Sequence, residues 1–111
     1  MQIEINTDSN IEGSEVLSAH VKGAVESALT RFSDRVTRVE VHLSDVNSGK
    51  GGQDDKRCMM EVRLEGRQPT AVTHQATTLD QAVAGAASKL KRSVEHTLDR
   101  ESTLRGLRDH R

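Results

Sequence analysis

Four basic or near-basic side chains recur at helical spacing near the end of the sequence: Lys89, Arg92, His96 and Arg100. At about 100° per residue, a helix places them within an arc of about 80°, roughly a quarter to a third of a turn from its apolar stripe. Cations spaced in this way suit the phosphates of a nucleic-acid backbone, which provide most sequence-independent binding energy. The same spacing also fits a solvated helix face, which is the usual origin of a run of charges.

The charge of the chain is unevenly distributed. The 111 residues hold 16 Lys and Arg against 17 Asp and Glu, for a formal charge of -1. Residues 1–48 hold four bases and eight acids, whereas residues 89–111 hold seven bases and four acids. The overall balance argues against a generic polyanion binder, and any polyanion contact should involve the C-terminal fifth of the chain. Glu95 and Asp99 lie beside the basic arc and weaken its field.

Aromatic side chains are almost absent. Phe32 is the single Phe, and the chain has no Trp and no Tyr. Proteins that read single-stranded nucleic acid stack bases on such rings, so a base-stacking surface is excluded. If the chain binds nucleic acid, it must do so through phosphates and the shape of folded RNA.

Residue types that support catalysis or metal binding occur without the patterns that these chemistries need. Cys58 is the single cysteine, and it falls on the inward face of a predicted strand, as a core residue would. None of the five histidines shows H-x-x-x-H or H-E-x-x-H spacing. The sequence therefore predicts no catalytic residue, metal site, cofactor or small-molecule substrate.

A glycine-rich segment, residues 45–55, invites a phosphate-loop interpretation. A phosphate loop needs G-x-x-x-x-G-K-[ST] at the start of a helix, and this segment leads into a predicted strand instead. We therefore expect a hairpin connection that is mobile when nothing is bound to it, because it offers few apolar anchors.

The elements that must position these residues follow from hydrophobic periodicity. A helix is expected over residues 15–32, with Ser14 as its N-cap, and a second helix begins after a cap at Thr77 or Thr78. The apolar spacing thins after Arg100, where we expect fraying or disorder. Strands are expected over residues 2–6, 36–44, 56–65 and 70–75.

The predicted strands are polar on one face and apolar on the other, so both helices should cover one face of the sheet. The inward residues are Val39, Val41, Leu43, Cys58, Met60, Val62 and Leu64. The fold class is therefore α+β: a two-layer sandwich in β-α-β-β-β-α order with a four-stranded mixed sheet. A right-handed crossover makes the first two strands parallel. The chain length gives one domain over residues 1–100, followed by a basic, disordered tail at 101–111.

Several short motifs follow one another along the chain. They are the initial Met-Gln-Ile-Glu-Ile-Asn, residues 29–36, 39–43, 45–58 and 61–66, and Ala82-Val with Lys89-Leu-Lys-Arg92. Their order resembles that of the bacterial ribosome hibernation promoting factors and ribosome-associated translation inhibitors in their short form. The resemblance implies a fold like the double-stranded-RNA-binding domain. It also implies a position on the small ribosomal subunit, in the channel for messenger and transfer RNA, where members of the family block initiation under stress.

The resemblance also implies site residues. The basic positions of the family's last helix match Lys89 and Arg92, and the next one is His96 here. The Asp-Arg pair that follows the first helix matches Asp34 and Arg35. Together with the helical spacing, this gives a predicted RNA-binding set of Arg35, Lys89, Arg92, His96 and Arg100.

We expect a cytoplasmic protein that binds ribosomal RNA of the small subunit and restrains translation. The N-terminus lacks the features of a signal peptide, and no stretch is apolar enough to span a membrane. The alternative is a binding module of the same fold that has lost ribosome affinity and contacts a protein partner. A third hypothesis is an enzyme that uses Cys58. The sequence does not specify an oligomeric state.

Overall fold

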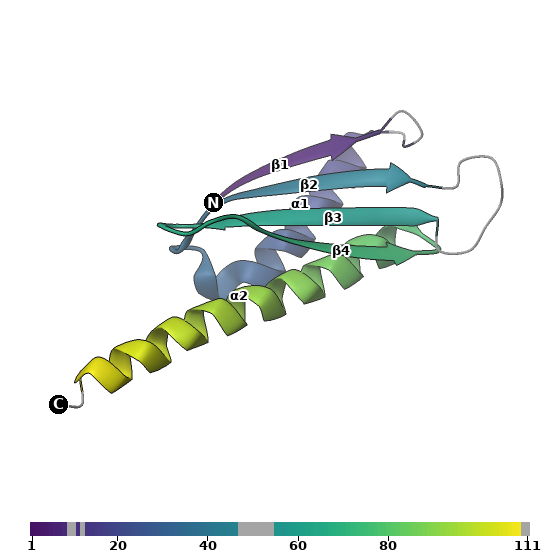
Figure 1. Cartoon of the computed structure of the whole chain (residues 1–111). Helices are drawn as coiled ribbons and strands as arrows, with labels where there is room; N and C mark the ends of the chain where they lie inside the picture. The colour runs from purple at the N-terminus through teal and green to yellow at the C-terminus, as the bar shows by residue number, and fades with distance from the viewer. Residues whose placement is uncertain (9–10, 12, 47–54, 110–111) are drawn as a thin grey trace.

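A computed structural model describes residues 1–8, 11, 13–46 and 55–109, with side chains as far as Arg100. The predicted mobile segment at 45–55 lies largely outside the described residues, so its mobility stays a prediction. The elements are β1 (Gln2–Thr7), α1 (Glu15–Leu29), a 3-10 turn η1 (Thr30–Phe32), β2 (Val36–Asp45), β3 (Lys56–Leu64), β4 (Thr70–Ala76) and α2 (Leu79–Asp109) (Figure 1).

The sheet has four strands in the order β1-β2-β3-β4. Strand β1 runs parallel to β2, while the β2–β3 and β3–β4 pairs are antiparallel. Both helices lie against the same face of this sheet (Figure 1). The predicted α+β sandwich and its mixed sheet are therefore confirmed.

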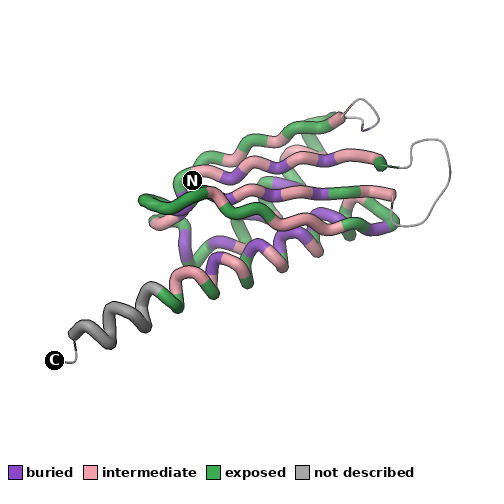
Figure 2. Tube along the Cα trace, in the orientation of Figure 1, coloured by how far each residue is buried: buried purple, intermediate pink, exposed green. Residues whose placement is uncertain are grey.

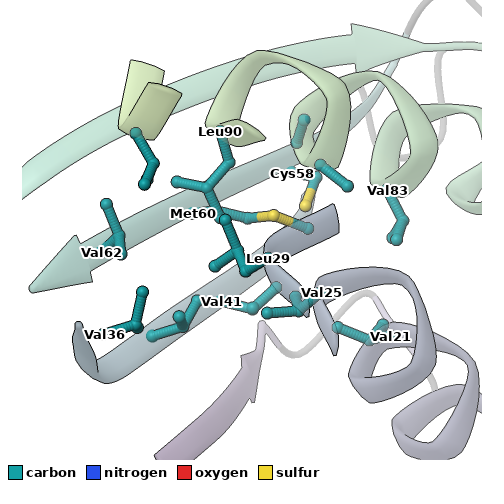
Figure 3. Packing of buried hydrophobic residues seen from close by; sticks show 14 of the residues in the cluster. Val21, Val25, Leu29, Val36, Val41, Cys58, Met60, Val62, Val83 and Leu90 are labelled. Carbon is teal, nitrogen blue, oxygen red and sulfur yellow. The ribbon is translucent and has the colours of Figure 1, made fainter. Parts of the chain in front are cut away.

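The core lies between the sheet and the helices, as the alternation of apolar residues predicted. The β2–β3 register pairs Val39 with Val62 and Val41 with Met60, and all four side chains are buried. Figure 3 shows Val41, Met60 and Val62 beside side chains of both helices, with Leu29 of α1 and Leu90 of α2 near the centre. Figure 2 shows this alternation along β2 and β3, where buried residues alternate with more exposed ones.

Both helices begin at hydroxyl caps. The Ser14 hydroxyl accepts a hydrogen bond of 3.1 Å from the backbone N–H of Leu17, so the predicted cap of α1 is confirmed. At the second helix the Thr78 hydroxyl accepts a 3.1 Å bond from the N–H of Gln81. Of the two caps that the sequence left open, the structure therefore uses Thr78.

Helix α2 is longer than the sequence predicted. Its backbone is helical to Asp109 and projects beyond the sheet, whereas the apolar spacing indicated an end near Arg100 (Figure 1). In this final stretch Leu104, Arg105, Leu107 and Arg108 are good helix formers, whereas Gly106 is not. The division of the chain into a domain at 1–100 and a tail at 101–111 stays a prediction.

Candidate nucleic-acid interface

The basic stripe, defined as Lys89, Arg92, His96 and Arg100, lies on one side of α2. The orientation of the helix is fixed by its apolar stripe, because Val83, Ala86, Leu90 and Val94 are buried in the core. Arg92, His96 and Arg100 are exposed and Lys89 is half-buried. The structure thus brings four of the five predicted site residues together on one helix.

Lys89 is anchored at the edge of the sheet. Its ammonium donates a hydrogen bond of 2.8 Å to the backbone carbonyl of Thr73 in β4. Strand β4 is an edge strand, so this carbonyl has no partner in a further strand. An ammonium has three donors, and the bond to Thr73 uses one of them. Lys89 can therefore hold the strand edge and still donate to an anion.

Glu95, which the sequence placed beside the basic stripe as a weakening charge, is paired. Its Oε2 lies 3.5 Å from Nη1 of Arg31, and the guanidinium carbon of Arg31 lies 5.2 Å from the centroid of the Phe32 ring. The pair joins η1 to the middle of α2 and offsets the Glu95 charge. Sequence reasoning missed Arg31 because nothing in the local pattern shows that two residues so distant in sequence meet.

Arg35, the fifth predicted residue, belongs to a different element. It lies between η1 and β2, where its N–H donates to the carbonyl of Phe32 and its own carbonyl accepts from the N–H of Glu65, both at 2.9 Å. These bonds place Arg35 beside the turn that joins β3 to β4. It is therefore at the end of the sheet where β2 begins, and not on α2.

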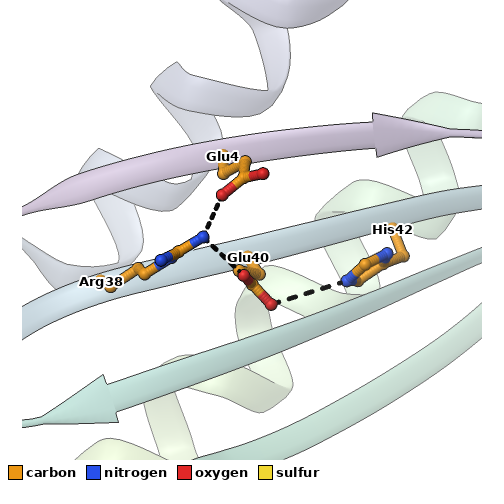
Figure 4. Close-up of polar contacts among 4 residues, drawn as sticks. All are labelled: Glu4, Arg38, Glu40 and His42. Atoms are coloured by element: carbon orange, nitrogen blue, oxygen red, sulfur yellow. Dashed lines mark hydrogen bonds and ion pairs between the residues drawn. The ribbon is translucent and has the colours of Figure 1, made fainter.

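The open face of the sheet carries a network of charged side chains (Figure 4). The Arg38 guanidinium contacts Glu4 of the neighbouring strand and lies 2.7 Å from Glu40. His42 Nε2 lies 3.9 Å from the other oxygen of Glu40. No aromatic ring other than histidine belongs to the face, because Phe32 is buried in the core. Among the described residues, the face therefore has no Phe, Tyr or Trp ring on which bases could stack.

Cys58 does not have the environment of a nucleophile. It is fully buried, and desolvation raises the pKa of its thiol to about 12. The thiol is therefore neutral at ordinary pH, whereas nucleophilic attack needs the thiolate. The interpretation of Cys58 as a core residue is confirmed.

The described part of the chain holds neither a candidate metal site nor a helix that could span a membrane. No group of three His, Cys, Asp or Glu side chains there could hold a metal ion. Nor does any helix in those residues combine the length and apolar character needed to cross a membrane.

Comparison with known proteins gives the family. The family model described as "Sigma 54 modulation protein / S30EA ribosomal protein" matches residues 3–102. The chain belongs to this family. The resemblance to hibernation promoting factors that the motifs indicated is thereby confirmed, and the family is one of ribosome-associated factors, not of enzymes.

Solved structures agree with the fold. The N-terminal domain of Protein Y from Thermus thermophilus has a TM-score of 0.71 at 22% identity, covering 87% of this chain and 99% of that one. A ribosomal subunit interface protein from Coxiella burnetii has a TM-score of 0.66 at 17% identity, covering 89% and 99%. A search of curated proteins found no match. At these identities the two structures support the fold of this chain and nothing finer.

Proposed function

We propose that this protein binds the small ribosomal subunit through phosphates of ribosomal RNA, and that it restrains translation in the cytoplasm under stress. The observation that carries the proposal is the basic stripe of α2, which projects from a helix whose apolar stripe is buried in the core. Family membership supplies the ribosome as the partner. Arg35 adds a cation at the end of the sheet.

The mode of binding follows from the side chains present. Arg92 and Arg100 can each offer a planar, permanently charged guanidinium to a phosphate, and Lys89 offers an ammonium. Without stacking rings the contacts carry little base specificity, so the shape of folded RNA must position the backbone. A protein bound in this way occupies the subunit without chemistry and acts by exclusion.

The test is co-sedimentation of the protein with purified small subunits over a range of salt concentrations. Phosphate contacts release counterions, so affinity should fall steeply as salt rises. The Lys89→Glu/Arg92→Glu double variant should bind much more weakly and with a shallower salt dependence, by roughly one unit of slope for each lost contact. The same variant should fail to inhibit initiation in a reconstituted translation reaction that the wild-type protein inhibits.

Lys22→Glu provides the matched control for a single Arg92→Glu change. Both side chains are exposed on helices, but Lys22 lies on α1, away from the basic stripe. Lys22→Glu should bind as the wild type does. If the wild-type protein does not sediment with small subunits at low salt, the proposal is wrong and the alternative of a module that contacts a protein partner takes its place. If the double variant binds like the wild type, the basic stripe is only a solvated face.

A further inference from the structure

The open face of the sheet restricts where an RNA backbone can lie. The register aligns Glu4 with Glu40 and Glu40 with Glu61, so three carboxylates form a row across β1, β2 and β3. Arg38, which contacts two of them, offsets only part of this charge. A phosphate over the middle of the sheet would meet this row and be repelled. An RNA backbone is therefore kept away from the centre of the open face.

Beyond this row, toward the start of β2 and the end of β3, the open face carries arginines. Arg38 and Arg63 are register partners on the side of the row where β2 begins and β3 ends. A hollow of about 460 Å³ opens next to them at the β3–β4 turn. Its lining residues are Thr37, Arg63, Leu64, Glu65, Gly66, Arg67 and Gln68.

The walls of this hollow are held by the backbone. The register shifts between Val36 and Arg38, which makes Thr37 an extra residue opposite the end of β3. Such bulges redirect side chains at the ends of strands. The Thr37 hydroxyl donates a 3.1 Å hydrogen bond to the carbonyl of Arg63, which ties the two strands together at this point.

The turn itself is also well defined. The N–H of Arg67 donates to the carbonyl of Leu64 at 3.1 Å, and Gly66 has a φ of 73° in the third position of the turn. A turn of this kind requires a positive φ there, which glycine supplies without strain. The adjacent N–H of Glu65 donates to the carbonyl of Arg35, so the turn and the predicted site residue Arg35 form one unit.

We infer that this hollow is a second phosphate-binding site, at which Arg63 and Arg67 hold the backbone of the same RNA that the basic stripe of α2 contacts. The inference rests on the proposed function, and it extends the proposed RNA-binding surface from α2 to the end of the sheet. Arg63 is exposed and takes part in no hydrogen bond or ion pair through its guanidinium among the described residues. The lining of the hollow carries two guanidinium groups and one carboxylate, that of Glu65, which opposes an anion.

The inference has a matched internal control in Arg57. Arg57 and Arg63 are both exposed arginines of β3 whose side chains share the open face. They lie about 20 Å apart along the strand, on opposite sides of the carboxylate row. That separation exceeds twice the screening length of about 8 Å at physiological salt. At that salt, a phosphate bound at Arg63 is therefore screened from Arg57. An effect of net charge would change affinity equally in the two variants, whereas local phosphate contacts would not.

The experiment measures the affinity of purified small subunits for Arg63→Gln, Arg67→Gln and Arg57→Gln as a function of salt. Arg63→Gln and Arg67→Gln should each lower affinity roughly three- to five-fold at about 0.15 M salt and reduce the salt slope by about one. Arg57→Gln should leave both quantities unchanged. Arg63→Lys, which keeps the charge, should retain most of the binding and guards against a loss caused by misfolding.

Two results would overturn the inference, and they are separable from failure of the proposed function. If Arg92→Glu weakens binding while Arg63→Gln and Arg67→Gln do not, the function stands and the second site does not exist. If Arg57→Gln weakens binding as much as Arg63→Gln, the effect is one of overall charge and the hollow is no site. If the wild-type protein shows no salt-dependent binding to small subunits, the proposed function fails first.

Discussion

Gly23 and Gly85 lie in helix interiors, and their surroundings predict opposite results for the same substitution. A Cβ at Gly85 of α2 would overlap the imidazole ring of His74 at Cγ, Cδ2 and Nε2. A Cβ at Gly23 of α1 would meet nothing within 4 Å. Gly23→Ala should therefore raise the free energy of unfolding by about 0.5–1 kcal/mol, as expected for Gly to Ala in a helix. Gly85→Ala should lower it, because the whole ring of His74 must move.

Urea unfolding of the two variants checks this pair. The rescue experiment is the double change Gly85→Ala/His74→Ala, compared with His74→Ala alone. Once the ring is removed, Gly85→Ala should become stabilising, like Gly23→Ala. A Gly85→Ala variant that is more stable than the wild type would contradict the close packing of His74 on α2.

The buried thiol of Cys58 predicts a loss of stability at alkaline pH. Burial raises the pKa of the folded-state thiol from about 9.0 to about 12. Because the pKa is raised, the neutral buried thiol contributes its full stability below the pKa of the unfolded state. This contribution is lost as pH rises toward the pKa of the folded state. Stability should therefore decline between pH 9 and pH 12, by at most about 1.4 kcal/mol per pH unit for this group. Cys58→Ala should show a shallower decline over the same range in urea unfolding.

At the scale of elements, an ion-pair cluster joins the end of β2 to the start of β3. The Lys56 ammonium lies 2.8 Å from Asp45 Oδ2 and 3.6 Å from Asp55 Oδ2. The hydrogen bond to Asp45 is the main cause that raises the pKa of Lys56 above its usual 10.5. The stability that the ion pairs of Lys56 contribute is therefore complete below pH 10.5. It is lost at higher pH, as the ammonium of the folded protein loses its proton.

The Lys56→Arg change isolates this contribution, because a guanidinium stays protonated throughout the range. Both Lys56→Arg and the unchanged Lys56 should be measured in a Cys58→Ala background, which removes the titration of the thiol. The protein that keeps Lys56 should lose stability more steeply above pH 10.5 than the Lys56→Arg variant. Parallel curves would mean that the ion pairs contribute nothing measurable.

The sequence predicted the elements well because their signals are local. Alternation in β2 and β3 identified the buried faces, and hydroxyl residues at the helix starts identified the caps. The features that it missed need three-dimensional information. The Arg31–Glu95 pair requires η1 and α2 to meet, and the hollow at Arg63 requires both the β2–β3 register and the bulge at Thr37. The end of α2 was missed because apolar periodicity, the signal that predicted the extent of the helix, thins after Arg100.

For the whole molecule, the question is whether overall charge or local charge governs the proposed binding. The protein has a formal charge of -1, so general attraction to RNA cannot explain affinity. The structure offers two carboxylates of α2 for comparison. Glu95 borders the basic stripe and pairs with Arg31, while Asp80 in the first turn lies 3.4 Å from His20. At 1.5 Å per residue the two positions are about 22 Å apart, well beyond the screening length of about 8 Å.

Glu95→Gln and Asp80→Asn raise the net charge by the same amount and should affect small-subunit binding differently. Glu95→Gln removes a negative charge beside the basic stripe and releases Arg31. One unit charge at about 8 Å in water contributes about 0.5 kcal/mol per phosphate. The affinity for small subunits should therefore rise roughly two- to five-fold. Asp80→Asn should leave affinity at physiological salt unchanged. The measurement is a salt-resolved binding curve for both variants. Equal gains in the two would show that net charge governs binding, whereas a gain confined to Glu95→Gln would locate the RNA backbone along the middle of α2.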